Sequence, residues 1–91
     1  MISQITIKVT KNGESKDVWF LFESSHKDLF ELNEALANDG TVYGQRVDTE
    51  AAGPGRRREI NRYECIVSRE TIVTIIPAQS RLLPPVDAVR A

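Results

Sequence analysis

Residues 4–22 read QITIKVTKNGESKDVWFLF, two stretches of alternating polar and apolar residues on either side of Asn12-Gly13. Alternation with a period of two is typical of a β-strand that buries one face. Asn-Gly between two such stretches favours a two-residue hairpin turn, because both turn positions need a positive φ. The stretch therefore predicts a β-hairpin.

The register of this hairpin follows from its turn. A two-residue loop pairs Lys11 with Glu14, so that facing residue numbers sum to 25. Lys8 then faces Asp17, and apolar residues face one another at the alternate positions, so the turn agrees with the pattern. One face is expected to carry Ile5, Ile7, Val9, Val18, Phe20 and Phe22, and the other Gln4, Thr6, Lys8, Trp19 and Leu21.

An amphipathic helix is expected from His26 to Asn38. Ser25, with Asp28 three residues later, is a variant of the capping box at the helix start. Gly40 is suited to the left-handed conformation that ends a helix. The apolar stripe consists of Leu29, Leu32 and Leu36, with Phe30 and Ala35 beside it.

Three more strands are expected over residues 41–49, 59–67 and 71–76. Gly44 interrupts the first of them, which indicates a bulge or a close approach of another backbone. Residues 50–58 are a loop by composition, with glycines on both sides of Pro54. The packing residues of the first strand are expected to be Val42, Tyr43 and Val47.

The predicted order β-β-α-β-β-β defines an α+β fold, with a small antiparallel sheet and one helix packed on one face. The sheet is expected to be strongly bent or to form a partial barrel. Residues 1–77 are predicted to form a single domain. Residues 78–91 contain Leu82, Leu83 and two prolines without strand or helix periodicity, and are predicted to form an extended or flexible C-terminal tail.

Composition limits the function. The chain has 91 residues, 41% of them apolar and 27% charged, which is ordinary for a globular domain. No apolar run approaches the roughly 20 residues of a membrane span and no charged leader is visible, so we expect a cytoplasmic protein without a membrane partner. The single Cys65 and single His26 exclude an internal disulfide and a multi-cysteine zinc site, so we expect no metal and no cofactor.

No arrangement of residues favours catalysis, and the chain is predicted not to be an enzyme. His26 has no third group to orient its ring toward a nucleophile. Cys65 lies between an acid and an isoleucine on a predicted strand, as expected of a core thiol. The glycines around Pro54 are followed by arginines and a strand, whereas a phosphate loop needs a helix.

The interpretation we favour is a non-catalytic protein–protein interaction module that could form a homodimer. Trp19 and Leu21 face away from the two phenylalanines of their strand, and an aromatic patch of that kind is common at interfaces. Leu82 and Leu83 are the apolar part of the tail, and could cover this surface or bind another protein. Proteins of this size often act as adaptors, inhibitors or regulators, and this one could come from a phage or a mobile element.

The alternative is a nucleic-acid-binding module. The chain has 12 basic and 13 acidic residues, a net charge of −1, yet every arginine lies in residues 46–91. Arg56, Arg57 and Arg58, with Arg62 further on, could contact phosphates, and Tyr63 could stack on a base.

Residues 68–77 resemble the last strand of Sm-like RNA-binding barrels such as Hfq. A short basic turn at Ser68-Arg69 precedes a β-branched strand that ends at Pro77. The similarity covers ten residues. It implies a small barrel that contacts RNA.

Overall fold

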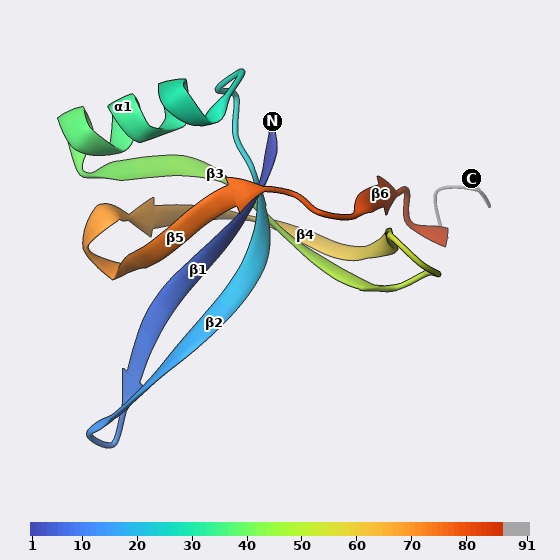
Figure 1. The fold of residues 1–91 in the computed structure, drawn as a ribbon, viewed down its shortest axis with the longest axis horizontal. Helices are drawn as coiled ribbons and strands as arrows, with labels where there is room; N and C mark the ends of the chain where they lie inside the picture. The colour runs from blue at the N-terminus through green and yellow to red at the C-terminus, as the bar shows by residue number, and fades with distance from the viewer. Residues whose placement is uncertain (87–91) are drawn as a thin grey trace.

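The computed structural model describes residues 1–86 and confirms the α+β fold. Within these residues one helix accompanies a mixed six-stranded sheet in the order β5-β1-β2-β3-β4-β6 (Figure 1). The elements are β1 Ile2–Lys11, β2 Glu14–Glu23, α1 Leu29–Asp39, β3 Thr41–Ala51, β4 Arg56–Ser68, the 3-10 turn η1 Arg69–Thr71, β5 Ile72–Pro77 and β6 Arg81–Leu83.

The hairpin of β1 and β2 has the predicted register. Lys11 pairs with Glu14 and Lys8 with Asp17, and the sum of 25 holds along all ten pairs. Asn12 and Gly13 have φ values of 54° and 80°, as a two-residue turn of this hand requires. Local turn chemistry thus sets the alignment of both strands.

The helix starts later than predicted. Leu29 is its first residue, and Asp28 is the N-cap, with its carboxylate accepting a hydrogen bond from the Glu31 backbone N–H at 2.9 Å. The prediction that Ser25 caps the helix was therefore wrong. Serine and aspartate are both good N-cap residues, but only Asp28 directly precedes the turn that begins the leucine stripe. Gly40 ends the helix with a φ of 78°, as predicted.

The core lies between α1 and the face of the sheet that carries Phe22. Its buried members are Ile5, Phe20, Phe22, Leu32, Leu36, Val42 and Val67. Fully burying one such side chain contributes about 1.5–3 kcal/mol. Two residues expected to pack do not: Phe30 is on the solvent side of α1 and Tyr43 is on the opposite face of β3, and both are exposed.

Gly44 marks a close approach of β3 to β2. A Cβ atom at this position would overlap the Glu23 carbonyl oxygen and the Phe22 ring. β2 and β3 pair over only three residue pairs, whereas the β3–β4 hairpin pairs over eleven. The sheet bends sharply at this junction, and the two hairpins diverge from it (Figure 1).

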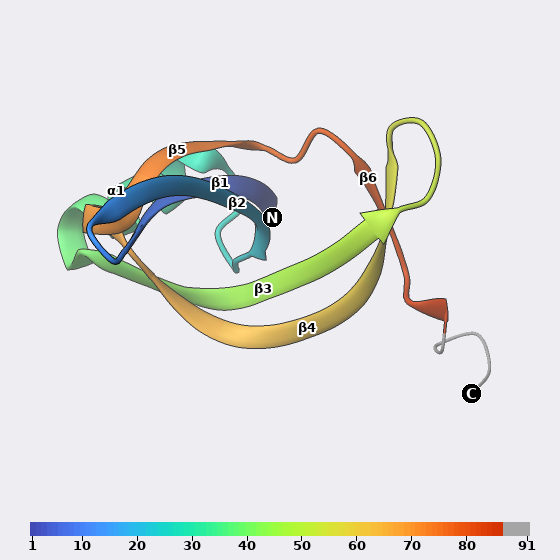
Figure 2. The same ribbon diagram turned by 90° about the horizontal axis from the view of Figure 1, so that it is seen from below.

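The sheet stays open. β4 pairs with β3 on one side and, over Arg56–Arg58 alone, with β6 on the other. Figure 2 shows β3 and β4 arching beneath the β1–β2 hairpin, with β5 on the far side. The strongly bent sheet is therefore the correct alternative, and the closed barrel implied by residues 68–77 does not form.

The tail is partly ordered as a strand, which the sequence did not indicate. Residues 81–83 pair in parallel with β4 after the chain has crossed from β5 (Figure 2). β3 and β4 also extend into the predicted loop, leaving only residues 52–55 between them. The tail prediction for residues 87–91 lies outside the described residues. No helix in residues 1–86 is both long and apolar enough to cross a membrane.

Replacing Gly44 with alanine tests the junction. We expect Gly44→Ala to lower the free energy of unfolding by about 2–3 kcal/mol, because the added methyl has no space beside Phe22 and Glu23. Gly40→Ala is the control: its Cβ meets no atom within 4 Å, so only its positive φ opposes it, at about 1 kcal/mol. Urea unfolding of both variants measures the difference. A cost at Gly44 no greater than at Gly40 would contradict the close approach.

Candidate functional site

Within residues 1–86 the sheet has an open edge along part of β4, in addition to the outer edge of β5. No strand of the described residues pairs with residues 59–68 of β4 on the side away from β3. Ile60, Tyr63 and Ile66 are exposed along this stretch at 49%, 46% and 68%. We call these three residues and the backbone between them the β4 edge surface. Unpaired N–H and C=O groups beside exposed apolar side chains form a template for another strand.

A mainly apolar groove runs along this edge. It has a volume of about 330 Å³ and lies between β4 and the β1–β2 hairpin. The Arg46 guanidinium lies over the Phe20 ring at 5.1 Å and over the Tyr63 ring at 5.8 Å, and its Nε donates to Asp48 at 3.1 Å. Other lining residues are Ile7, Cys65, Ile66, Val67, Ser68 and Thr71.

Trp19 and Leu21 share a face, as predicted, but differ in exposure. Trp19 is 47% exposed, and the Arg57 guanidinium lies 5.6 Å from its ring centroid. Leu21 is 3% exposed and pairs with the buried Val47. The chain itself therefore covers Leu21, and only Trp19 remains open to a partner.

The two tail leucines do not form a free apolar segment. Leu82 pairs with Arg57 and Leu83 with Arg58 in the parallel ladder of β6 and β4, and both side chains are half-buried. Their role in the structure is to fix the tail beside the start of β4.

The three consecutive arginines lie in a strand rather than in a loop. Arg57 donates from Nε to Thr49 Oγ1 at 2.6 Å, and Arg58 donates to the Pro84 carbonyl oxygen at 3.0 Å. Arg56 is exposed. The prediction of a flexible arginine loop was wrong, because pairing with β3 and β6 extends β4 through these residues.

β6 adds a fourth arginine to this end of the molecule. Arg81 lies opposite Arg56 in the ladder, and we call residues 56–58 and 81 the arginine tip. Within residues 1–86 no carboxylate lies within 4.0 Å of these four guanidinium groups, although Glu50 faces Arg58 across β3 and β4. Like charges opposite one another destabilise a ladder, so an anion at the tip would relieve repulsion.

Arg62 has a structural role. Its guanidinium donates to Glu59 Oε1 at 2.7 Å, to Gln45 Oε1 at 3.0 Å and to the Glu23 carboxylate. The hydrogen bond with Glu59 is the largest of the effects that raise the pKa of Arg62. This network joins β2, β3 and β4, so Arg62 is not available for nucleic acid, while Tyr63 beside it is exposed.

Residues with catalytic or metal-binding chemistry are dispersed. His26 Nδ1 lies 3.5 Å from Glu31 Oε1 near the start of α1. Cys65 is half-buried against the core, and burial raises the pKa of its thiol. In the described part of the chain no three His, Cys, Asp or Glu side chains gather closely enough to hold a metal ion.

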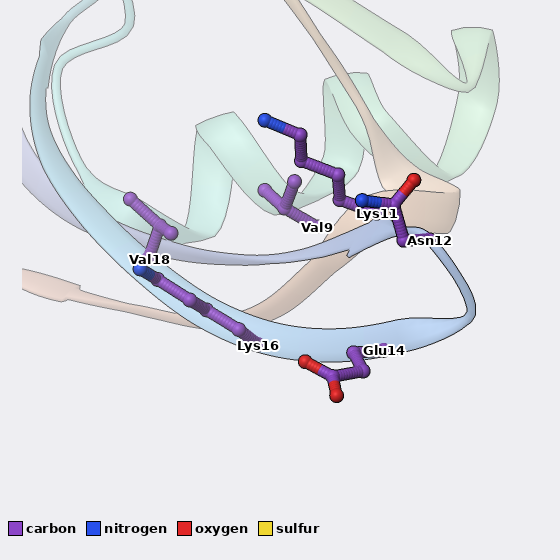
Figure 3. Close-up of a pocket in the computed structure, with 6 residues that line it drawn as sticks. All are labelled: Val9, Lys11, Asn12, Glu14, Lys16 and Val18. Atoms are coloured by element: carbon purple, nitrogen blue, oxygen red, sulfur yellow. The ribbon is translucent and has the colours of Figure 1, made fainter.

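A wide depression lies at the tip of the β1–β2 hairpin. Figure 3 shows its six lining residues on the two strands and the turn between them, and its volume is about 670 Å³. Val9 and Val18 form its apolar part, and Lys11, Asn12, Glu14 and Lys16 surround them. All but Val18 are exposed, so the depression is a curled strand surface rather than a sheltered pocket.

The β4 edge surface was missed in the sequence because no local signal marks a strand edge. Apolar residues on both faces of residues 59–67 were the available hint. Comparisons of the chain with protein-family models, with curated proteins and with solved structures found no match.

The Arg62 network predicts a stability effect. We expect Arg62→Met to lower the free energy of unfolding by about 1–3 kcal/mol, because it leaves the largely buried Glu59 carboxylate without its partner. Arg56→Met is the control: Arg56 is exposed, so its change should stay within about 0.5 kcal/mol. Denaturant unfolding measures both, and equal effects would contradict the network.

Proposed function

We propose that this chain is a non-catalytic protein–protein interaction module that self-associates through the β4 edge surface. The observation that carries the proposal is the edge of β4 over residues 59–68, which no strand within residues 1–86 pairs with and along which Ile60, Tyr63 and Ile66 are exposed. We include a cytoplasmic location in the proposal, because a chain with one cysteine has no need of an oxidising compartment.

The apolar character of the edge supports this proposal. Proteins usually protect edge strands with charged side chains, proline, a bulge or a covering element. Between Asn61 and Val67, β4 has no proline, and Arg62, one of its two charged residues, is hydrogen-bonded to Glu59, Gln45 and Glu23 of its own chain. The groove beside β4 offers space for side chains of an added strand. Strand addition gives affinity through backbone hydrogen bonds and specificity through such side-chain sites.

Light scattering during size-exclusion chromatography tests self-association. We expect the mass to rise from 10.2 kDa toward twice that value as protein concentration increases, and to do so also in high salt, because the contact is largely apolar. Ile66→Lys should hold the protein as a monomer, since it places a charge on the edge.

Phe30→Lys is the matched control. Phe30 is 73% exposed but lies on α1, so its variant should associate like the wild type. A wild type that stays monomeric would contradict the proposal, and so would equal effects of the two lysine substitutions. Loss of association in Trp19→Ala but not in Ile66→Lys would move the interface to Trp19.

A second candidate function is binding of single-stranded nucleic acid at the arginine tip. It is favoured by the juxtaposition of Arg56 and Arg81 without an ion pair among the described residues, and by the nearby Trp19 ring. Trp19, Thr49, Arg57 and Ile60 line a groove of about 400 Å³ that could hold a base. Phosphate contacts from arginine and stacking on an aromatic ring are the usual elements of such sites.

Binding of a labelled single-stranded oligonucleotide, followed by anisotropy across a salt series, tests this candidate. Affinity should fall with salt, with a slope of about 0.7 for each phosphate contacted. Arg56→Gln with Arg81→Gln should weaken binding about tenfold or more and reduce the slope by about 1.4, and binding should quench the single tryptophan. The control is Lys8→Gln with Lys16→Gln, which removes the same amount of positive charge from the β1–β2 hairpin. An equal loss in that control, or no binding at low salt, would contradict the candidate.

A further inference from the structure

We infer that the partner on the β4 edge is a second copy of this chain, with the two β4 strands antiparallel about a twofold axis that passes beside Tyr63. This inference rests on the proposed function and specifies its geometry. It follows from the order of side chains along β4 and from the rules that govern a symmetric strand pair.

Symmetry leaves few registers. When the β4 strands of two copies pair in antiparallel orientation, a twofold axis perpendicular to the joined sheet relates the copies. Each face of one sheet then continues into the same face of the other. Directly opposite residues share a face. Facing residue numbers must therefore have an even sum, which places one residue opposite itself on the axis.

The charges on β4 disfavour two of these registers. With Arg62 on the axis, two arginines face each other, and with Glu64 on the axis, two glutamates do. With Tyr63 on the axis the sum is 126 and, within residues 59–67, no charge faces its own kind. Arg62, which keeps its hydrogen bonds to Glu59, Gln45 and Glu23 of its own chain, then lies opposite Glu64 of the other copy. This register avoids the like-charge contacts that destabilise a strand pair.

The apolar residues agree with the same register. Ile60 of each copy then faces Ile66 of the other, and the two Tyr63 side chains meet on the axis. All three belong to the β4 edge surface, so one arrangement covers its exposed residues. Ile60 has no partner on β3, because the β3–β4 register shifts there, and this bulge lies at the end of the shared ladder.

The proposed register places Asn61 opposite Cys65 of the second copy. Disulfide trapping therefore tests this register. Asn61→Cys with the native Cys65 should give a covalent dimer of twice 10.2 kDa on a non-reducing gel after mild oxidation. Within one chain these two positions are about 13 Å apart along an extended strand, too far for an internal disulfide. Tyr63→Cys with Cys65→Ser should give the same dimer through a single bond on the axis.

Val73→Cys is the control, because Val73 is 46% exposed on the outer edge strand β5 and should not be linked to Cys65. A covalent dimer of Val73→Cys, with none of Asn61→Cys, would overturn the twofold arrangement. It would instead indicate head-to-tail pairing of β4 in one copy with β5 in the next. A dimer seen by light scattering that neither β4 variant traps would overturn this register and leave the proposed function standing. A protein that remains monomeric by light scattering would overturn both.

Discussion

The structure depends on the close approach of β2 and β3 at Gly44. The backbone of Glu23 and the ring of Phe22 occupy the space that a side chain at residue 44 would need. The two long hairpins therefore meet over only three residue pairs and cross at a sharp bend. At this bend Phe20 and Phe22 are buried on the core face of β2, and Leu21 and Val47 are buried on the other face of the sheet.

The open edge follows from the order of the strands. β1 and β2 lead away from β3 and β4, and β5 pairs with β1, so no strand in residues 1–86 reaches the free side of β4 between residues 59 and 68. The Arg62 network then holds the hairpins together from the other face. The close approach at Gly44 and the Arg62 network therefore act at the same junction of β2 with β3, on opposite faces of the sheet.

The sequence predicted those features that depend on neighbouring residues. The Asn12-Gly13 turn defines the register of its hairpin, and the leucine spacing defines the buried side of α1. The close approach at Gly44 was also predicted, since a glycine within a strand often marks a bulge or a backbone that passes close by.

The features that were not predicted depend on contacts distant in sequence. The parallel pairing of β6 with β4 brings residues 81–83 beside residues 56–58, and nothing in either segment indicates the other. The arginines therefore looked like part of a loop, although two of them are hydrogen-bonded within the fold. The edge of β4 is a property of the whole strand order, so its exposed isoleucines could not be distinguished from core residues in the sequence.

The central claim is that the edge of β4 is open in the monomer and covered in the dimer. Hydrogen exchange tests it most directly, at those backbone amides of residues 61–65 that point away from β3. In dilute protein these amides should exchange at rates close to those of unstructured backbone, while amides bonded to β3 stay protected. At high concentration they should become protected, because a second copy covers the edge. Protection that is the same at every concentration, whether strong or absent, would contradict an edge that is open in the monomer and covered by association.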